Sequence, residues 1–342
     1  MARETARRQQ SQSAWKRILK RPEAGALGGA VLVFVFFWIV APPFRQFTAF
    51  TTVLYQASTI GIPAVAVALL MIGGEFDLSA GVAVTTISLA ASIFATHVAG
   101  NLWAGVIFSL AFALMLGAIN GWLLIKTKLP SFLVTLGSFL MLQGLNIAIT
   151  KLITGNVATE DISGMAGFNA LKLIFAATFQ IGSVQISIAI FYWILLVAIA
   201  TWILLRTKMG NWIIAVGGQS DSARAVGVPV TKVKIGLFMT VSFGCWVLAM
   251  HLLFAYDTVQ SGEGIGNELL YIAASVVGGC LLTGGYGSAV GSALGAFIFG
   301  MTTEGVIYAD WNADWFQFFV GAMLLLATVV NTWIRARASK GK

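Results

Sequence analysis

Long apolar runs separated by short polar segments dominate the chain. Asp, Glu, Lys and Arg are absent between Arg45 and Glu75, and similar charge-free runs recur as far as Arg335. About 20 apolar residues suffice for a helix to cross the hydrocarbon core of a bilayer. The pattern predicts ten membrane-spanning helices, near residues 25–43, 49–72, 82–99, 103–125, 131–150, 186–205, 235–255, 269–285, 288–306 and 315–334.

The segment 151–185 interrupts this pattern with Gly, Asn, Asp and Thr residues. A short apolar stretch near Leu171 to Phe179 lies within it. We expect an external loop that carries an interfacial helix, although a re-entrant segment also fits the composition.

Composition sets the class of protein. Hydrophobic residues make up 58% of the chain and charged residues 10%, whereas a soluble domain carries roughly 25% charged residues. The outer surface must therefore face lipid, which predicts an all-α, multi-pass membrane bundle with lipid as a partner.

The net charge of +8 follows the predicted topology. Of the 21 basic residues, only Arg45, Lys151 and Lys172 fall outside the segment before the first span, the loops near 126–128 and 206–234, and the C-terminal tail. Lys and Arg accumulate in cytoplasmic loops, so both termini are expected inside and nucleic acid is not an expected partner. The expected organisation is a basic segment 1–24, a transmembrane domain 25–334 and a basic tail 335–342.

A polar insert at 73–81 separates two long apolar runs. It contains Glu75, Asp77 and Ser79. A carboxylate at the bilayer centre costs roughly 2.5–3.5 kcal/mol or more, so these groups need an interface, a polar cavity or backbone amides. Asp77 fits an N-terminal cap for a helix beginning near Val82. Both an interfacial turn and a broken helix beside a transport path remain open.

A second glycine-rich stretch, 278–285, carries Thr283, Gly284 and Gly285. Aligned with 74–81, it repeats the first glycine, a leucine, a hydroxyl residue and the last glycine, which suggests an internal repeat and a second turn beside the pathway. Gly287, Gly291 and Gly295 follow at a spacing of four. That stripe predicts close helix packing, either within the chain or between subunits.

The loop 206–234 predicts one short helix from Ser220 to Val226. Ser220 can cap its start, and Gly227 followed by Pro229 ends it. Small residues on such a helix offer a compact knob for a soluble partner, and an ordinary connector fits equally.

Four segments together resemble a known family. They are Gly-Gly-Glu-Phe-Asp-Leu-Ser-Ala-Gly at 73–81, Leu-Pro-Ser-Phe-Leu-Val-Thr-Leu-Gly at 129–137, Gly-Gly-Gln-Ser-Asp-Ser-Ala-Arg-Ala-Val-Gly-Val at 217–228, and Val-Val-Gly-Gly-Cys-Leu-Leu-Thr-Gly-Gly-Tyr-Gly-Ser at 276–288. In this order they are similar to the ribose-type permease subunits of bacterial ABC sugar importers, across roughly residues 50 to 330.

The resemblance implies a homodimeric or heterodimeric permease of about ten helices per subunit in the bacterial inner membrane. It implies a separate cytoplasmic ATPase, which uses ATP and Mg²⁺, and an extracytoplasmic binding protein that delivers substrate. It assigns coupling to the ATPase to the segment 217–228. The coupling residues it implies are Gly217, Gly218, Ala223, Arg224, Ala225 and Gly227. The run Ala223-Arg224-Ala225 stands where the family commonly has two paired alanines. Glu75 is an additional acidic residue beside Asp77.

Catalysis by this chain is not expected. It has no phosphate-binding loop of the form Gly-x-x-x-x-Gly-Lys-Ser/Thr. His97 and His251 lack motif-spaced partners, and Cys245 and Cys280 lie in apolar runs typical of core cysteines. No catalytic residue, metal site or bound cofactor is predicted.

A permease for a monosaccharide or polyol is the leading hypothesis. Sugar hydroxyls need hydrogen-bond partners, for which the candidates are Asn120, Gln143, Asn146 and Trp246, although helix–helix hydrogen bonds explain each amide equally well. A nucleoside or a furanosyl signal molecule is an alternative substrate. A secondary transporter that couples to protons through Glu75 or Asp77 is an alternative mechanism, and a membrane-bound enzyme is disfavoured.

Overall fold

The computed structural model describes residues 23–340, with side chains described up to residue 329. Eight helices in this part are long and apolar enough to cross a membrane. They are α3 (Glu23–Val40), α4 (Phe47–Ile72), α5 (Ala80–Phe94, continued by a π-helical turn to Ala99), α6 (Leu102–Thr127), α7 (Ser131–Thr154), α9 (Ile188–Arg206), α12 (Val230–Tyr256) and α14 (Ala289–Tyr308).

The last two predicted spans correspond to shorter apolar helices. The predicted helix over 269–285 is wrong in extent, because α13 (Asn267–Val277) ends where two glycines turn the chain. The predicted span at 315–334 lies within α15 (Trp315–Lys340), whose apolar part within the described side chains is Trp315–Val329. Eight spans are therefore supported, while the total of ten and the orientation stay predictions.

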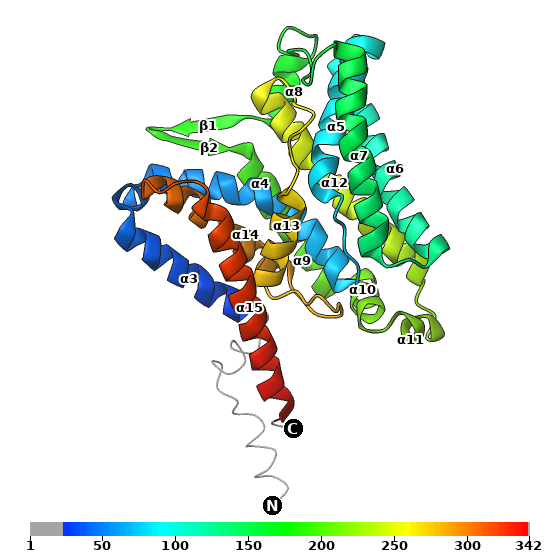
Figure 1. The fold of residues 1–342 in the computed structure, drawn as a ribbon, viewed down its shortest axis with the longest axis vertical. Helices are drawn as coiled ribbons and strands as arrows, with labels where there is room; N and C mark the ends of the chain where they lie inside the picture. The colour runs from blue at the N-terminus through cyan, green and yellow to red at the C-terminus, as the bar shows by residue number, and fades with distance from the viewer. Residues whose placement is uncertain (1–22, 341–342) are drawn as a thin grey trace, which may run out of the picture.

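The segment 151–185 holds more structure than predicted. The expected interfacial helix is α8 (Phe168–Phe175), and it is followed by a hairpin of β1 (Thr178–Ile181) and β2 (Val184–Ser187). Figure 1 shows α8 and the hairpin together at one end of the molecule, which we call the hairpin end. At the opposite side lie α10 (Lys208–Gly218) and α11 (Ser220–Ala225), which we call the α10 end.

The core is built around α4 and α12. Most residues of both helices are buried, whereas α3, α6, α7 and α9 expose apolar side chains along much of their length. Apolar side chains exposed on all these outer helices are expected where hydrocarbon covers the protein. The buried helices therefore carry the internal contacts, and the outer helices shield them from lipid.

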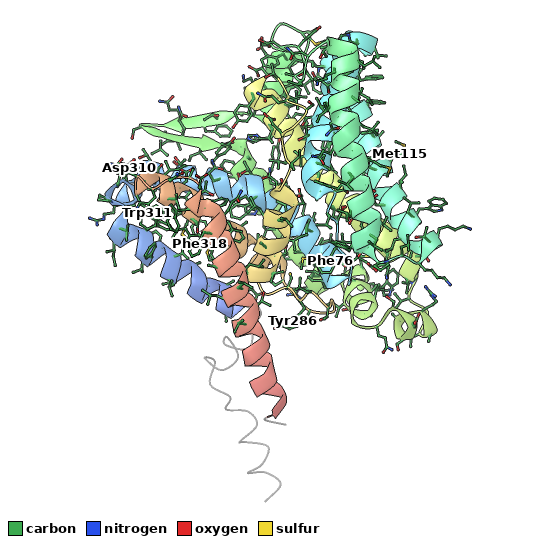
Figure 2. The ribbon with its side chains drawn as sticks, in the orientation of Figure 1. Phe76, Met115, Tyr286, Asp310, Trp311 and Phe318 are labelled. Atoms are coloured by element: carbon green, nitrogen blue, oxygen red, sulfur yellow. The ribbon has the colours of Figure 1, made fainter. Side chains whose placement is uncertain are left out.

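Glycines bring α14 close to its neighbours. A Cβ at Gly300 would lie 2.7 Å from the amide nitrogen of Ala57 in α4, and a Cβ at Gly305 would overlap the ring of Phe37 in α3. Phe37 also contacts Trp311, with ring centroids 6.5 Å apart, and Figure 2 shows Trp311 at the turn that leads into α15. This aromatic contact ties α3 to the C-terminal helices.

The stripe of Gly291 and Gly295 packs within the chain. A Cβ at Gly291 would overlap the carbonyl oxygen of Gly278, just after α13. A Cβ at Gly295 would overlap the carbonyl oxygen of Ala274, within α13. Gly287 is not on the helix as predicted, because it precedes Ala289 in the turn before α14. There a Cβ would lie 2.6 Å from the sulfur of Cys280.

Candidate functional site: a glycine junction and a hydroxyl-lined cavity

The turn that follows α4 is closed by backbone hydrogen bonds. The amide of Gly73 donates to Leu69 and the amide of Glu75 donates to Leu70, at 3.1 and 3.2 Å. Gly74 has φ of +85°, a left-handed conformation that a side chain disfavours. The glycine pair therefore stops α4 abruptly at the α10 end.

Two glycine turns and the glycine end of α10 meet at this point. The amide of Gly285 donates to the carbonyl of Ile72 at 2.8 Å. Gly217, at the C-terminal end of α10, lies against both groups: a Cβ there would overlap the Ile72 oxygen and lie 2.7 Å from the Gly285 nitrogen. We call the residues Ile72–Gly74, Gly217–Gly218 and Gly284–Gly285 the glycine junction. Figure 2 shows Phe76 and Tyr286 on the turns beside it, toward the end where α10 lies.

Backbone contacts hold the junction together. A Cβ at Gly284 would lie 2.6 Å from Cα of Gly74, and a Cβ at Gly285 would lie 2.9 Å from Cα of Gly218. Contacts this close exclude side chains and leave the segments little freedom to slide past one another. The predicted pathway and coupling residues Gly217, Gly218, Gly284 and Gly285 are thus brought into one cluster, whereas Thr283 is exposed beside it.

An ion pair fastens the same turn to α12. Lys234, near the start of α12, donates to Glu75. The Lys234 and Glu75 side chains keep only 15% and 11% of their accessible surface. Removing one partner of such a pair leaves the other charge poorly solvated, which is costly. The additional acid of the 73–81 segment therefore anchors the turn.

The chain from Glu75 to Ser79 is non-helical and runs along α7. The amide of Phe76 donates to the Ser131 hydroxyl, and the amide of Leu78 donates to the Thr135 hydroxyl, both at 3.1 Å. Backbone amides away from water require such partners. The motif at 129–137 thus supplies the hydrogen-bond acceptors for the motif at 73–81.

Asp77 begins a buried polar network that crosses three helices. Its Oδ1 accepts from the amide and hydroxyl of Ser79, at 2.8 and 2.6 Å. Asn120 of α6 donates to the Ser79 hydroxyl at 3.1 Å and accepts from Ser138 of α7 at 2.6 Å. Asp77 therefore caps the turn before α5 and not the first turn of the helix, and Asn120 bonds helices together.

The other predicted sugar contacts belong to separate places. The indole of Trp246 donates to Ser109 of α6 at 3.1 Å, and Gln143 is half-buried on α7. Asn146 lines a largely apolar cavity of about 300 Å³ between α5, α6 and α7. Its amide nitrogen has no hydrogen-bond partner among the described residues. The structure does not gather these four side chains around one site.

The segment between α9 and α12 contains two helices instead of the single one predicted. Ser220 does not cap α11, since its hydroxyl donates to the carbonyl of Val216 at 2.9 Å. Ala223 is buried, while Arg224, Ala225 and Gly227 are exposed. Val226 keeps 80% of its accessible surface, so the tip presents an apolar side chain that sequence reasoning did not single out.

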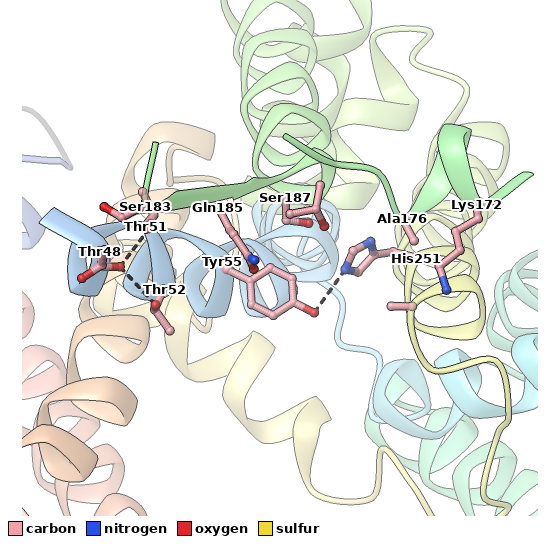
Figure 3. A pocket seen from close by; sticks show the side chains of 12 residues that line it. Thr48, Thr51, Thr52, Tyr55, Lys172, Ala176, Ser183, Gln185, Ser187 and His251 are labelled. Atoms are coloured by element: carbon pink, nitrogen blue, oxygen red, sulfur yellow. Dashed lines mark hydrogen bonds between the residues drawn. The ribbon is translucent and has the colours of Figure 1, made fainter. Parts of the chain in front are cut away.

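A polar cavity opens at the hairpin end (Figure 3). It measures about 470 Å³ and lies between α4, α8, the hairpin and α12. We call it the hydroxyl-lined cavity. Its lining residues are Thr48, Thr51, Thr52, Tyr55, Lys172, Ala176, Thr178, Ser183, Gln185, Ser187, His251 and Ala255.

Histidine and lysine are partnered in this cavity. Nδ1 of His251 contacts the carbonyl of Phe175 at 2.8 Å, and Nε2 contacts the Tyr55 hydroxyl at 3.3 Å. A carbonyl only accepts, so Nδ1 carries a proton and, in neutral histidine, the Tyr55 hydroxyl donates to Nε2. Lys172 reaches both carboxylate oxygens of Asp257, at 3.2 and 3.4 Å.

The remaining polar candidates are dispersed. His97 lies 4.0 Å from Glu160 near the hairpin end, and Cys245 and Cys280 are buried free thiols. No group of three or more His, Cys, Asp or Glu side chains that could hold a metal ion occurs among the described residues. Among the described residues, the candidate functional features are therefore the backbone contacts of the glycine junction and the hydroxyl groups of the cavity.

Comparison with known proteins identifies the family. Residues 49–328 match the family described as branched-chain amino acid transport system, permease component. The chain belongs to this family. It is a multi-pass transport protein of the inner membrane, in accord with its eight candidate spans.

Curated relatives of this permease cover most of its length. It is 28% identical to the fructose import permease of Rhizobium meliloti over 86% of this chain and 81% of the relative. It is 28% identical to the xylose transport system permease of Escherichia coli over 90% and 91%, and 29% identical to the ribose import permease of Escherichia coli over 85% and 87%. No solved structure matches the chain.

Proposed function

We propose that this chain is the permease subunit of an ATP-driven importer for a monosaccharide or polyol. The three relatives named above are permeases for fructose, xylose and ribose. Their similarity extends over most of both chains, and a hydroxyl-rich cavity suits a hydroxyl-rich cargo. These observations favour a sugar over the amino acid in the family description.

We expect the partners to bind at the two ends of the molecule. A cytoplasmic ATPase, which would use ATP and Mg²⁺, docks on the exposed surface of α11 around Arg224 and Val226. An extracytoplasmic binding protein releases substrate above the hairpin, and a second permease subunit completes the pathway. Isolated exposed apolar residues are common, but an apolar tip flanked by a charge suits a protein interface.

Alternating access driven from α11 is the proposed mechanism. The observation that carries it is the position of Gly217, in backbone contact with both the end of α4 and the turn before α14. Displacement of α10 would therefore move both elements together. The 26 residues of α4 span about 39 Å, and the other end of this helix forms one wall of the hydroxyl-lined cavity.

Reconstitution tests the proposal. The full chain is placed in proteoliposomes with and without its ATPase and binding protein, and uptake of labelled D-ribose, D-xylose and D-fructose is measured. We expect uptake of at least one sugar that requires ATP, the ATPase and the binding protein. Uptake by the chain alone, independent of ATP, would instead identify a secondary transporter and overturn the proposal.

A further inference from the structure

A stripe of hydroxyl groups follows one face of α4 at the hairpin end. Thr48, Thr51, Thr52 and Tyr55 are spaced i, i+3, i+4 and i+7, which places them on the same side of a helix. The rest of α4 is predominantly apolar. Polar residues on a membrane helix are expected to face a cavity or a partner, and Figure 3 shows these four along the floor of the cavity.

The hairpin faces this stripe with polar side chains of its own. In the antiparallel register Thr178 pairs with Ser187 and Gln180 pairs with Gln185. Alternation along a strand puts these four on one face, and the apolar residues Phe179, Ile181, Val184 and Ile186 on the other. Three members of the polar face, Thr178, Gln185 and Ser187, line the cavity. The hairpin is thus amphipathic, with its polar face turned to the hydroxyl stripe.

The lining residues can still both donate and accept hydrogen bonds. The hydroxyls of Thr51 and Thr52 donate to the carbonyl of Thr48, at 2.8 and 3.1 Å, so their lone pairs can accept. The Ser187 hydroxyl accepts from the amide of Ala189 at 3.3 Å, so its proton can be donated. Exposed Gln185 adds an amide that both donates and accepts. A ligand with several hydroxyl groups matches this mixture.

The charge of the cavity favours an uncharged ligand. Lys172 is the one lining residue with a permanent charge, and Asp257 neutralises it through both carboxylate oxygens. Both ring nitrogens of His251 already have partners, the carbonyl of Phe175 and the hydroxyl of Tyr55. Small-molecule sites commonly measure about 300–1,000 Å³, and this cavity of about 470 Å³ falls in that range.

We propose that the hydroxyl-lined cavity is a binding site for the uncharged sugar on its way through the permease. The hairpin forms the roof of the site and α4 forms its floor. The inference rests on the proposed function and adds to it a place where the permease itself contacts the cargo. It also gives the permease its own contribution to selectivity, through Gln185 and the threonines of α4.

Two pairs of matched variants test the site. Gln185→Leu removes a lining amide, and Gln180→Leu makes the same change on the hairpin outside the lining. Thr52→Val removes a lining hydroxyl that bonds the carbonyl four residues earlier. Thr303→Val removes a hydroxyl with the same type of bond, to Phe299 of α14, away from the cavity. The threonine pair therefore shares its local structural cost, and Gln180→Leu also removes a side-chain hydrogen bond to the carbonyl of Gly182.

Binding of D-ribose, D-xylose and D-fructose to the full chain in lipid nanodiscs is measured by saturation-transfer NMR. We expect at least one sugar to bind at millimolar concentration, and Gln185→Leu and Thr52→Val each to weaken it about threefold to tenfold, the loss of one hydrogen bond. Thr52→Ser should restore binding, and the two control variants should match the unchanged chain.

Parallel uptake assays separate the two proposals. Sugar uptake by the complete importer together with absent binding, or with equal binding by lining and control variants, overturns the cavity site and leaves the proposed function standing. Absence of ATP-dependent uptake of any sugar by the unchanged importer contradicts the proposed function itself. Reduced binding and a raised KM for uptake, confined to the lining variants, support both.

Discussion

Two turns at the α10 end share a backbone conformation but differ in what surrounds them. Gly73 and Gly278 have φ of −71° and −67°, and Gly74 and Gly279 have φ of +85° and +93°. In each turn the next amide donates five residues back, from Glu75 to Leu70 and from Cys280 to Ser275. The equivalent glycines are thus one position away from the predicted alignment, which set Gly74 against Gly278.

Beyond the glycines the two turns diverge. The first continues as an extended chain whose amides bond Ser131 and Thr135, and Glu75 pairs with Lys234. The second is compact and bonds within itself, as from the amide of Leu281 to the carbonyl of Tyr286 at 3.1 Å. Side chains fasten the first turn in addition to the backbone contacts of Gly74, whereas the second turn relies on close backbone packing. Substitutions at equivalent positions should therefore have unequal effects.

The largest difference is expected between Gly278→Ala and Gly73→Ala. A Cβ at Gly278 would overlap the backbone of Gly291, which cannot move without shifting α14. At Gly73 it would overlap the end of the Leu237 side chain, and the nearest backbone atom would be the Leu70 oxygen, at 3.1 Å. We expect a cost of about 3 kcal/mol or more for Gly278→Ala and about 1 kcal/mol for Gly73→Ala. Melting temperatures of the purified protein in detergent, followed by tryptophan fluorescence, measure the difference. Equal melting temperatures of the two variants would contradict this difference in packing between the two turns.

The ion pair gives the next largest effect. Glu75→Gln leaves Lys234 without its partner, and we expect a loss of about 2–3 kcal/mol. The equivalent change on the second turn, Cys280→Ala, removes only a sulfur atom and should cost about 1 kcal/mol. The double variant Glu75→Gln/Lys234→Met should recover most of the loss. A double variant as unstable as Glu75→Gln would show that the pair does not fasten the turn.

The hydroxyl acceptors of α7 should matter less. Thr135→Val removes the acceptor for the amide of Leu78, and we expect a cost of about 1 kcal/mol. Thr127→Val is the matched control, because both hydroxyls also donate to a carbonyl four residues earlier. Amide hydrogen exchange of the segment 76–79 should accelerate only in Thr135→Val. Unchanged exchange in Thr135→Val would show that this hydroxyl of α7 does not support the segment.

The smallest effect concerns the loop between α7 and α8, which bonds to the loop before α13 through the amide of Ile162 and the carbonyl of Asp257. Hydrogen bonds from the hydroxyl and amide of Ser163 lower the pKa of Asp161 below its usual 3.8. A lowered carboxyl pKa contributes stability that is present above the unfolded-state pKa and is lost as the pH falls through the folded-state pKa. Acidification from about pH 6 to about pH 3 should therefore loosen residues 161–163 slightly. In Asp161→Asn, exchange of the neighbouring amides should lose this pH dependence.

The hydrophobic pattern predicted the helices well where a long charge-free run was the dominant signal. The charge-free runs placed α4, α6, α7 and α14 within a few residues of their observed bounds. The run at 269–285 failed, because hydropathy does not register that Gly278 and Gly279 end a helix. The hairpin was missed as well, since strands of four residues leave almost no periodic signal.

The site was predicted in pieces. The motifs at 73–81, 217–228 and 278–288 were recognised, but their meeting in one junction depends on tertiary contacts such as Gly217 on Ile72. The hydroxyl-lined cavity was missed, although the spacing of Thr48, Thr51, Thr52 and Tyr55 in an apolar helix was a readable signal. The role of Asn120 as a sugar contact stays a prediction. In the structure it bonds Ser79 and Ser138, and a buried amide bonds neighbouring helices as readily as it bonds a ligand.

The proposed coupling of ATP hydrolysis to transport through the glycine junction is tested most directly by Gly217→Ala. A Cβ there would overlap the carbonyl of Ile72, whereas a Cβ at the adjacent Gly218 would enter open space. In proteoliposomes that contain the complete importer, sugar molecules taken up per ATP hydrolysed are measured for both variants after checking equal insertion. We expect Gly217→Ala to lower this ratio at least tenfold and Gly218→Ala to leave it unchanged. Equal ratios in the two variants would contradict coupling through the glycine junction.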